Sequence, residues 1–119
     1  WLASMINKWQ PDLIILEDIQ LQRFDGQSGG VLTYKKLAAL QGVLINYIYE
    51  SGISYQIIPP ATWRNFNEIK GRTRNDQKKN AQLKVKRLYD ISVTQDEADA
   101  ILIGRYGANK HKQNQMIEF

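Results

Sequence analysis

The 119-residue sequence has the length of one small domain, a net charge of +4, a single histidine and no cysteine. The absence of cysteine excludes disulfides, thiolate catalysis and cysteine-based zinc sites, so a bound metal needs oxygen ligands, as Mg²⁺ and Mn²⁺ do. Because there is no signal-peptide pattern and no run of about 18 uncharged apolar residues, we expect a cytoplasmic protein without a membrane segment.

The first third of the chain predicts a helix, a strand and a loop. Apolar residues recur at helical spacing from Trp1 to Trp9. The continuous apolar run Leu13–Leu16 is typical of a strand that is covered on both faces in a parallel sheet, and it ends at Glu17. Residues 20–32 form a polar, glycine-bearing loop that is long enough to suggest a function.

A second helix and a second strand follow. Residues Thr33–Glu50 predict a helix whose inward side is formed by Leu37, Leu40, Leu44, Tyr47 and Ile48. Its apolar surface is broader than one packing face requires. Residues Ile53–Ile58 predict a strand, which two prolines close.

The last third predicts two helices and a tail. A basic helix covers about Asn75–Tyr89, and its predicted inward stripe consists of Ala81, Val85 and Leu88. The final helix covers Gln95 to Gly107, and residues 109–119 are predicted to be a polar tail. Strands that alternate with helices indicate an α/β layer with parallel pairing. Because two strands seldom form a stable sheet, we expect further strands upstream or from a partner.

Half of the 16 basic residues lie in one short segment that overlaps the basic helix. A cluster of this kind favours a polyanionic partner, nucleic acid first, although a solvated lysine-rich helix face is the alternative. The cluster consists of Lys70, Arg72, Arg74, Lys78, Lys79, Lys84, Lys86 and Arg87.

The final helix begins with several acidic residues. Thr94 and Glu97 have the spacing of a capping box, which sets the helix start. Asp96 and Asp99 are three residues apart and share the side of Leu102, which is expected to face inward. Two carboxylates there repel each other and lose hydration unless a cation lies between them. Asp96 alone has a second interpretation, as a residue that the helix dipole favours.

Glu17 is a third candidate, because it ends the first strand. In open α/β sheets, ligands bind beyond the carboxyl ends of the strands. Glu17 and Asp18 point to opposite faces, so only one of them can join a given cluster. The alternative is that Glu17 is a solvated acid at a strand end.

Taken in order, these motifs resemble the RuvC family of Holliday junction resolvases, especially the type of Gram-positive bacteria and their phages. The resemblance covers about residues 5–107. It is carried by Pro11-Asp12 before Leu13–Glu17, Gly42 in a helix that opens near Lys35, Pro-x-x-Trp-Arg at 60–64, Lys-Gly-Arg-x-Arg-x-x-x-Lys-Lys at 70–79 and Asp-Glu-Ala-Asp-Ala at 96–100.

The resemblance implies a truncated ribonuclease H-like fold over residues 1–108, without its opening β-meander, followed by the tail. It implies a crossover junction endodeoxyribonuclease of DNA recombination and repair, in which four carboxylates hold two Mg²⁺ ions, or Mn²⁺, and a DNA phosphodiester is hydrolysed. It assigns Glu17, Asp96 and Asp99 as catalytic metal ligands. It assigns the active-site basic residue to Lys78, with the neighbouring Lys79 as the alternative.

The resemblance also implies a branched-DNA partner and a homodimer. Because its apolar surface is broad, the helix Thr33–Glu50 is the predicted dimer interface; the alternative is that the missing strands cover this surface. The DNA-binding residues are then Lys70, Arg72, Arg74, Lys78 and Lys79. Phe24 is a candidate wedge at the junction, and Trp63 is either a base-stacking or a core residue. The family's first aspartate has no counterpart here, so we expect an inactive fragment. The alternatives are a non-catalytic nucleic-acid-binding module of the same fold and another ribonuclease H-like nuclease.

Overall fold

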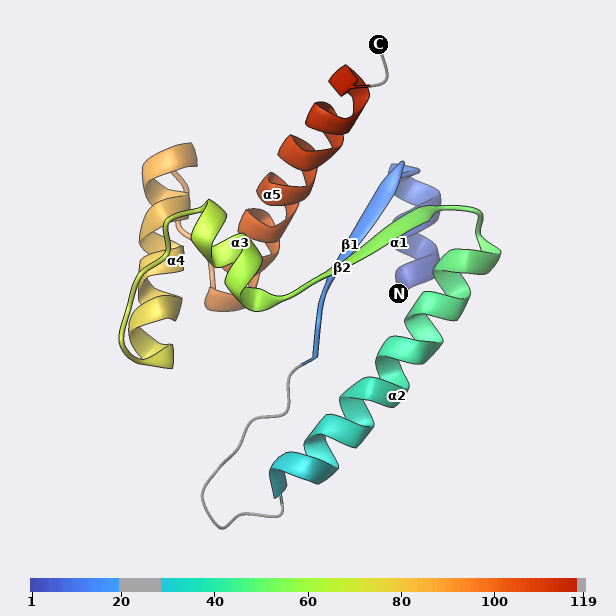
Figure 1. Ribbon diagram of the computed structural model, residues 1–119, viewed down its shortest axis with the longest axis horizontal. Helices are drawn as coiled ribbons and strands as arrows, with labels where there is room; N and C mark the ends of the chain where they lie inside the picture. Colours follow the sequence, from blue (N-terminus) through green and yellow to red (C-terminus); the bar gives the residue numbers. More distant parts are fainter. Residues whose placement is uncertain (20–28, 118–119) are drawn as a thin grey trace. The chain divides into compact units, whose positions relative to one another are not determined.

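The computed structural model describes residues 1–19 and 29–117, which form a mixed α/β chain that is mostly helical (Figure 1). Contacts divide the chain into two units, Trp1–Ile57 and Ile58–Phe119, which are described separately. The loop predicted for residues 20–32 lies mostly outside the described residues, and so does Phe24.

The first unit contains a β-α-β arrangement that follows a short helix. Helix α1 (Leu2–Trp9) ends at Gln10, which adopts a left-handed conformation and donates its N–H to the carbonyl of Ile6 at 2.8 Å. Strands β1 (Leu13–Glu17) and β2 (Ser54–Ile58) pair in parallel, and α2 (Gly29–Glu50) runs back between them (Figure 1). Parallel strands require such a crossover connection. The predicted strands and their parallel pairing are therefore confirmed.

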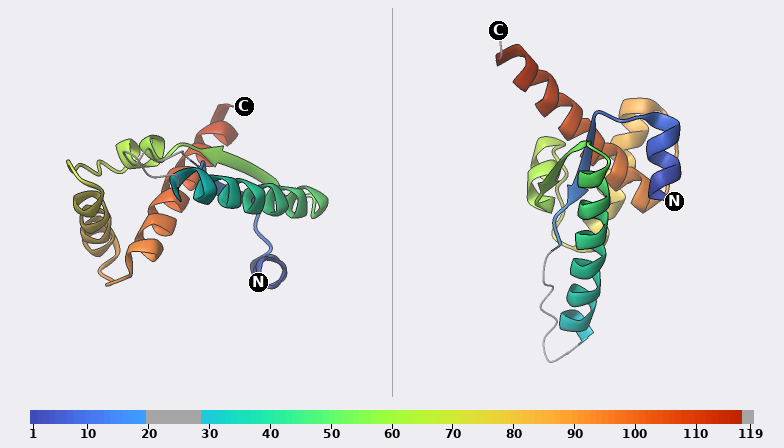
Figure 2. Two further views of the ribbon diagram at one scale, coloured as in Figure 1. Left: turned by 90° about the horizontal axis from the view of Figure 1, so that it is seen from below. Right: turned by 90° about the vertical axis from the view of Figure 1, so that its right-hand side faces the viewer.

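Helix α2 begins four residues before its predicted start and is continuous in both views of Figure 2. Its predicted inward side is only partly correct, because Leu37, Leu40 and Tyr47 are exposed, Leu44 is half-buried and Ile48 is fully buried. The reason is length: 22 helical residues span about 33 Å, whereas a five-residue strand spans about 17 Å. Among the described residues, the sheet is too short to cover the whole helix.

Strand β1 is less covered than its sequence predicts. Residues Leu13–Leu16 are half-buried rather than enclosed on both faces. Only one strand pairs with β1 among the described residues, so the sheet is too small to bury its apolar run completely. The first unit therefore buries less of β1 than its apolar sequence predicts.

The second unit opens with a helix that the sequence analysis missed, α3 (Pro60–Phe66). Pro59 is extended and serves as the N-cap, and Pro60 is the first helical residue. Proline is favoured at that position because its fixed φ suits a helix and its missing N–H is not needed there. Pro60 therefore marks the start of a helix as well as the end of the preceding strand.

Two longer helices complete this unit, α4 (Arg74–Tyr89) and α5 (Gln95–Ile117). The hydroxyl of Thr73 accepts the N–H of Asp76 at 3.1 Å and caps α4. Of the inward stripe predicted for α4, Ala81 and Val85 are buried, whereas Leu88 is exposed. Ala81 and Val85 are sufficient to form the buried side of α4, so Leu88 is left at the surface.

Helix α5 continues through Ile117, so the expected helix end at Gly107 is wrong. Gly107 is buried inside the helix instead of ending it. The following residues 108–113 are exposed and include alanine, lysine and glutamine, which favour helix over coil. Polarity alone therefore did not distinguish a solvated helix from a tail.

The core of the second unit lies where α3, α4 and α5 meet. Its fully buried side chains are Trp63, Asn67, Ala81, Val85, Ala98 and Leu102. Trp63 is only 1% exposed, so it is a core residue and not a base-stacking one. The rings of Phe66 and Tyr106 meet edge to face at 5.5 Å and join α3 to α5.

Asn67 is the buried polar group of this core. Its Nδ2 donates to the carbonyl oxygens of Trp63 at 2.7 Å and of Leu102 at 3.0 Å, and its Oδ1 accepts from Arg105 Nη1 at 3.0 Å. These bonds link the end of α3 to two successive turns of α5. A buried amide with this many partners specifies one arrangement of the two helices.

Candidate carboxylate site and basic surface

The start of α5 is organised by the predicted capping box. The backbone N–H of Thr94 donates to Glu97 Oε1 at 3.0 Å, and the N–H of Glu97 donates to Thr94 Oγ1 at 3.2 Å. Two backbone donors that lack helical partners are satisfied reciprocally. The cap sets the first turn of α5, on which the two candidate aspartates lie.

The capping box predicts a pH-dependent contribution to stability. The Thr94 backbone amide, and next its hydroxyl, lower the pKa of the exposed Glu97 carboxyl below its ordinary value of 4.5. Because this pKa is lower in the folded chain, ionised Glu97 stabilises the fold above 4.5, and this contribution is lost as the pH falls through the folded pKa. We expect Glu97→Gln to be less stable than the wild type at neutral pH and equal to it in strong acid, as measured by urea unfolding. A stability difference that does not change with pH would contradict this.

The aspartates are less buried than the sequence indicates. Asp96 is exposed and Asp99 is half-buried. The fully buried stripe at the start of α5 passes through Ala98 and Leu102, which are four residues apart and lie on one face. The expectation that both aspartates share the inward side is wrong for Asp96, so the loss of hydration applies only to Asp99.

Glu17 lies at the exposed end of β1, as its place after the apolar run predicts. Its backbone carbonyl accepts from Gln41 Nε2 of α2 at 3.5 Å. Asp18 is exposed as well. Glu17 therefore belongs to the first unit and the aspartate pair to the second.

No group of three histidine, aspartate or glutamate side chains able to hold a metal ion occurs within residues 1–19 and 29–117. Because the two units are described separately, convergence of Glu17 with Asp96 and Asp99 stays a prediction. The aspartate pair supplies two carboxylates of the second unit, and Glu97 is engaged in the helix cap.

The predicted DNA-binding residues occupy the loop before α4 and its first two turns. Four of them are exposed and can therefore contact a binding partner: Lys70, Arg72, Arg74 and Lys79. Lys78 is half-buried, since it precedes Ala81 by three residues and Val85 by seven on the side that faces the core. The two neighbouring lysines therefore differ in exposure: Lys78 is half-buried and Lys79 is exposed.

Two amide side chains of α4 hold this loop in place. Gln77 Nε2 donates to the carbonyl of Gly71 at 3.3 Å, and Asn80 Nδ2 donates to the carbonyl of Lys70. A Cβ at Gly71 would lie only 2.9 Å from the backbone nitrogen of Gln77, so only glycine permits this approach. The sequence pattern does not predict these roles of Gln77 and Asn80; the one signal for them is their position beside the basic residues.

No family model matches this chain, and no curated protein or solved structure matches it either. None of the helices in the described part of the chain is both long enough and apolar enough to cross a membrane.

Proposed function

We propose that this chain is part of a structure-specific DNA endonuclease that resolves four-way junctions, similar to the RuvC family. The observation that carries the proposal is the capped start of α5, where Asp96 and Asp99 lie one turn apart in the same unit as the basic helix α4. Acidic metal ligands and a cationic surface are the two parts that metal-dependent cleavage of a polyanion requires.

The fold supports the proposal at a coarser level. A parallel β-α-β arrangement followed by helices is compatible with a ribonuclease H-like fold that lacks its opening meander. We propose this truncated fold as the ancestry of the chain.

The proposed metal site needs more ligands than the second unit contributes. Asp96 and Asp99 suit Mg²⁺ or Mn²⁺ because hard carboxylate oxygens match these ions. Two carboxylates do not balance two divalent ions, so the proposal adds Glu17 as a third ligand. When bound, the ions supply an activated water and stabilise the leaving oxygen. Lys78, or its neighbour Lys79, is proposed to offset negative charge at the reacting phosphate.

A non-catalytic nucleic-acid-binding module is the second candidate. It is favoured by the exposed side chains of Lys70, Arg72, Arg74 and Lys79, which can bind a polyanion without a metal ion. Such a module needs only the basic surface. An aspartate-bearing strand encoded before Trp1 would favour the enzyme, and its absence from the coding sequence would favour the module.

The substitution Asp99→Asn tests the enzymatic proposal in the full-length gene product. It removes one ligand charge while keeping the side-chain shape, so we expect Mg²⁺-dependent cleavage of a synthetic four-way junction to fall at least about 100-fold, since even outer-shell partners of metals contribute roughly 10–100-fold. Mn²⁺ binding, followed by electron paramagnetic resonance, should weaken in parallel. For the 119-residue chain alone we expect little or no cleavage.

Asp12→Asn is the matched control, because it removes the same charge from an exposed residue before β1, to which the proposal gives no role. It should leave cleavage and Mn²⁺ binding unchanged. Equal activity of Asp99→Asn and the wild type would remove Asp99 from the site. Preferential cleavage of an RNA:DNA hybrid would indicate another ribonuclease H-like nuclease.

We further propose that the exposed apolar face of α2 forms the homodimer. Leu37, Leu40 and Val43 are exposed on this helix, and a Cβ at Gly42 meets no atom within 4 Å. Paired active sites suit the two symmetric cuts that a four-way junction needs.

The substitution Leu40→Glu tests this dimer. Leu40 is 54% exposed in the chain, so a glutamate there disturbs an interface more than it disturbs the fold. We expect the dimer dissociation constant, measured by sedimentation, to rise at least about tenfold, because burying a leucine is worth about 1.5–3 kcal/mol. Leu83→Glu on α4, where the leucine is similarly exposed, should not change it. A wild type that stays monomeric at all concentrations would refute the dimer.

A further inference from the structure

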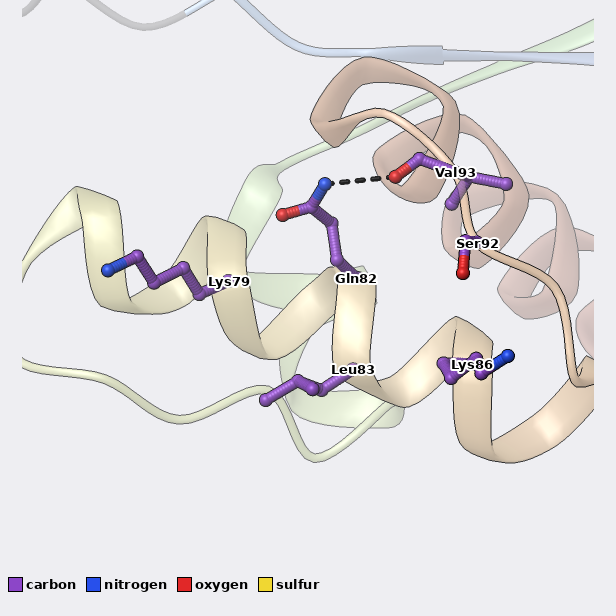
Figure 3. Close-up of a pocket in the computed structure, with 6 residues that line it drawn as sticks. All are labelled: Lys79, Gln82, Leu83, Lys86, Ser92 and Val93. Atoms are coloured by element: carbon purple, nitrogen blue, oxygen red, sulfur yellow. Dashed lines mark hydrogen bonds between the residues drawn. The ribbon is translucent and has the colours of Figure 1, made fainter.

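A groove runs along the outer side of α4, beside the segment that leads into α5 (Figure 3). Its volume is about 410 Å³, and it is lined by Lys79, Gln82, Leu83, Lys86, Ser92 and Val93. Gln82 Nε2 donates to the carbonyl of Val93 at 2.9 Å, which holds the two walls together. The groove is thus a fixed feature of the second unit, with one lysine toward each end.

A second hollow, of about 150 Å³, lies on the other side of Leu83. Lys70, Lys84 and Arg87 line it, together with Asn80 and the single acid Glu68. Asn80 donates to the carbonyl of Lys70, so the loop that carries Lys70 is tied to α4 at this point. Cations from two segments are therefore brought together around a small hollow, whose lining also includes Ile69 and Leu83.

The two hollows share Leu83 and form one surface, which we term the Leu83 face. It comprises Lys70, Lys79, Leu83, Lys84, Lys86 and Arg87. Glu68 offsets one of its five positive charges. Lys86 also pairs with Asp90 at 3.3 Å, but both side chains are largely exposed, and a pair of this kind contributes little and exchanges readily. The face therefore remains strongly cationic.

The chemistry of the face favours a phosphodiester backbone over a lipid surface. The apolar stripe of α4, Ala81 and Val85, is already buried in the core. Of the large apolar side chains that line the two hollows, only Leu83 is exposed, at 60%, whereas a membrane-bound helix needs a broad apolar side. Lys79 and Lys86 are seven residues apart, about 10.5 Å along the helix, and such regularly placed cations suit the repeating charges of a nucleic-acid strand.

We propose that the Leu83 face binds the DNA backbone, with phosphates in the two hollows and Leu83 against the sugar between them. This inference rests on the proposed function for the identity of the polyanion. It adds Lys84, Lys86 and Arg87 to the DNA-binding residues. None of the proposed metal ligands lies on this face, so binding there should not need a metal ion.

The test measures binding of a fluorescein-labelled four-way DNA by anisotropy, in EDTA and over a series of salt concentrations. Two double variants, Lys84→Ala/Arg87→Ala and Lys79→Ala/Lys86→Ala, each remove two charges from one hollow. Each should weaken binding about tenfold and lower the slope of log K against log salt by about 1.8, because each neutralised phosphate contributes about 0.9. The control Lys110→Ala/Lys112→Ala removes two exposed charges from α5 and should leave the slope unchanged.

A second pair of variants separates the shape of the face from net charge. Leu83→Asp inserts a carboxylate between the hollows at an exposed position and should weaken binding at least about tenfold, whereas Asn109→Asp adds the same charge on α5 and should not. The inference is overturned if the α4 variants bind like their controls, or if polyglutamate displaces the DNA as well as unlabelled DNA does. Loss of binding in the α4 variants together with unchanged cleavage by Asp99→Asn would support the face and reject the nuclease site.

Discussion

Replacing Trp63 by alanine is expected to lower the free energy of unfolding by about 3–5 kcal/mol, the usual effect of emptying a buried aromatic position. Trp63 is the largest fully buried side chain among the described residues. It lies on α3 in the core of the second unit, so its removal leaves a cavity. Since small domains are stable by only about 5–15 kcal/mol, this one substitution removes a large share of the total.

The chain offers a matched control in Trp9→Ala, since Trp9 is 66% exposed on α1. That variant should differ from the wild type by no more than about 0.5 kcal/mol. Urea unfolding followed by circular dichroism measures both variants. Tryptophan fluorescence adds a second readout for the wild type and Trp9→Ala, in which Trp63 is the buried tryptophan. Similar losses in the two variants would show that Trp63 is not the centre of the core.

The second large effect is expected from Asn67→Ala, which should cost about 2–4 kcal/mol. The substitution removes the donors to the carbonyls of Trp63 and Leu102 and the acceptor of Arg105. A buried polar group that loses its partner costs about 1–3 kcal/mol. The Trp63 carbonyl keeps the backbone N–H of residue 67 at 3.1 Å, and Arg105 is only half-buried, so the cost comes mainly from the lost bond to Leu102 and from the cavity.

Asn65→Ala is the control for this substitution, because Asn65 lies on α3, two residues before Asn67, and is exposed. It should change stability by less than about 0.5 kcal/mol. The same denaturation measurement applies. If Asn67→Ala were no more destabilising than this control, the hydrogen bonds of Asn67 would contribute nothing to stability.

The two substitutions also concern function, because the candidate residues stand on this core. The carboxylate pair lies on α5, and the Leu83 face lies on α4. Asn67 bonds to the carbonyl of Trp63 on α3 and to that of Leu102 on α5, so it fixes the helix that presents Asp96 and Asp99. A functional test of the carboxylates is therefore meaningful only in variants whose unfolding transition matches that of the wild type.

Local sequence determined most of the secondary structure and part of the candidate site. The strand Leu13–Glu17, the basic helix and the start of α5 follow from short-range patterns: a run of apolar residues, helical periodicity and the Thr94–Glu97 spacing. These features depend on contacts within a few residues, such as the reciprocal capping bonds. They can therefore be predicted without knowledge of the partners of each element.

Only the tertiary structure decided which side chains are covered, because burial depends on residues distant in sequence. Periodicity placed Leu37 and Leu40 on an inward face, but the short sheet leaves them exposed. It placed Asp96 inward, whereas the buried stripe of α5 runs through Ala98 and Leu102. The bond between Asn67 and Leu102 joins residues that are 35 positions apart. The hollows beside Leu83 are likewise lined by more than one segment of the chain, so no local pattern predicts them.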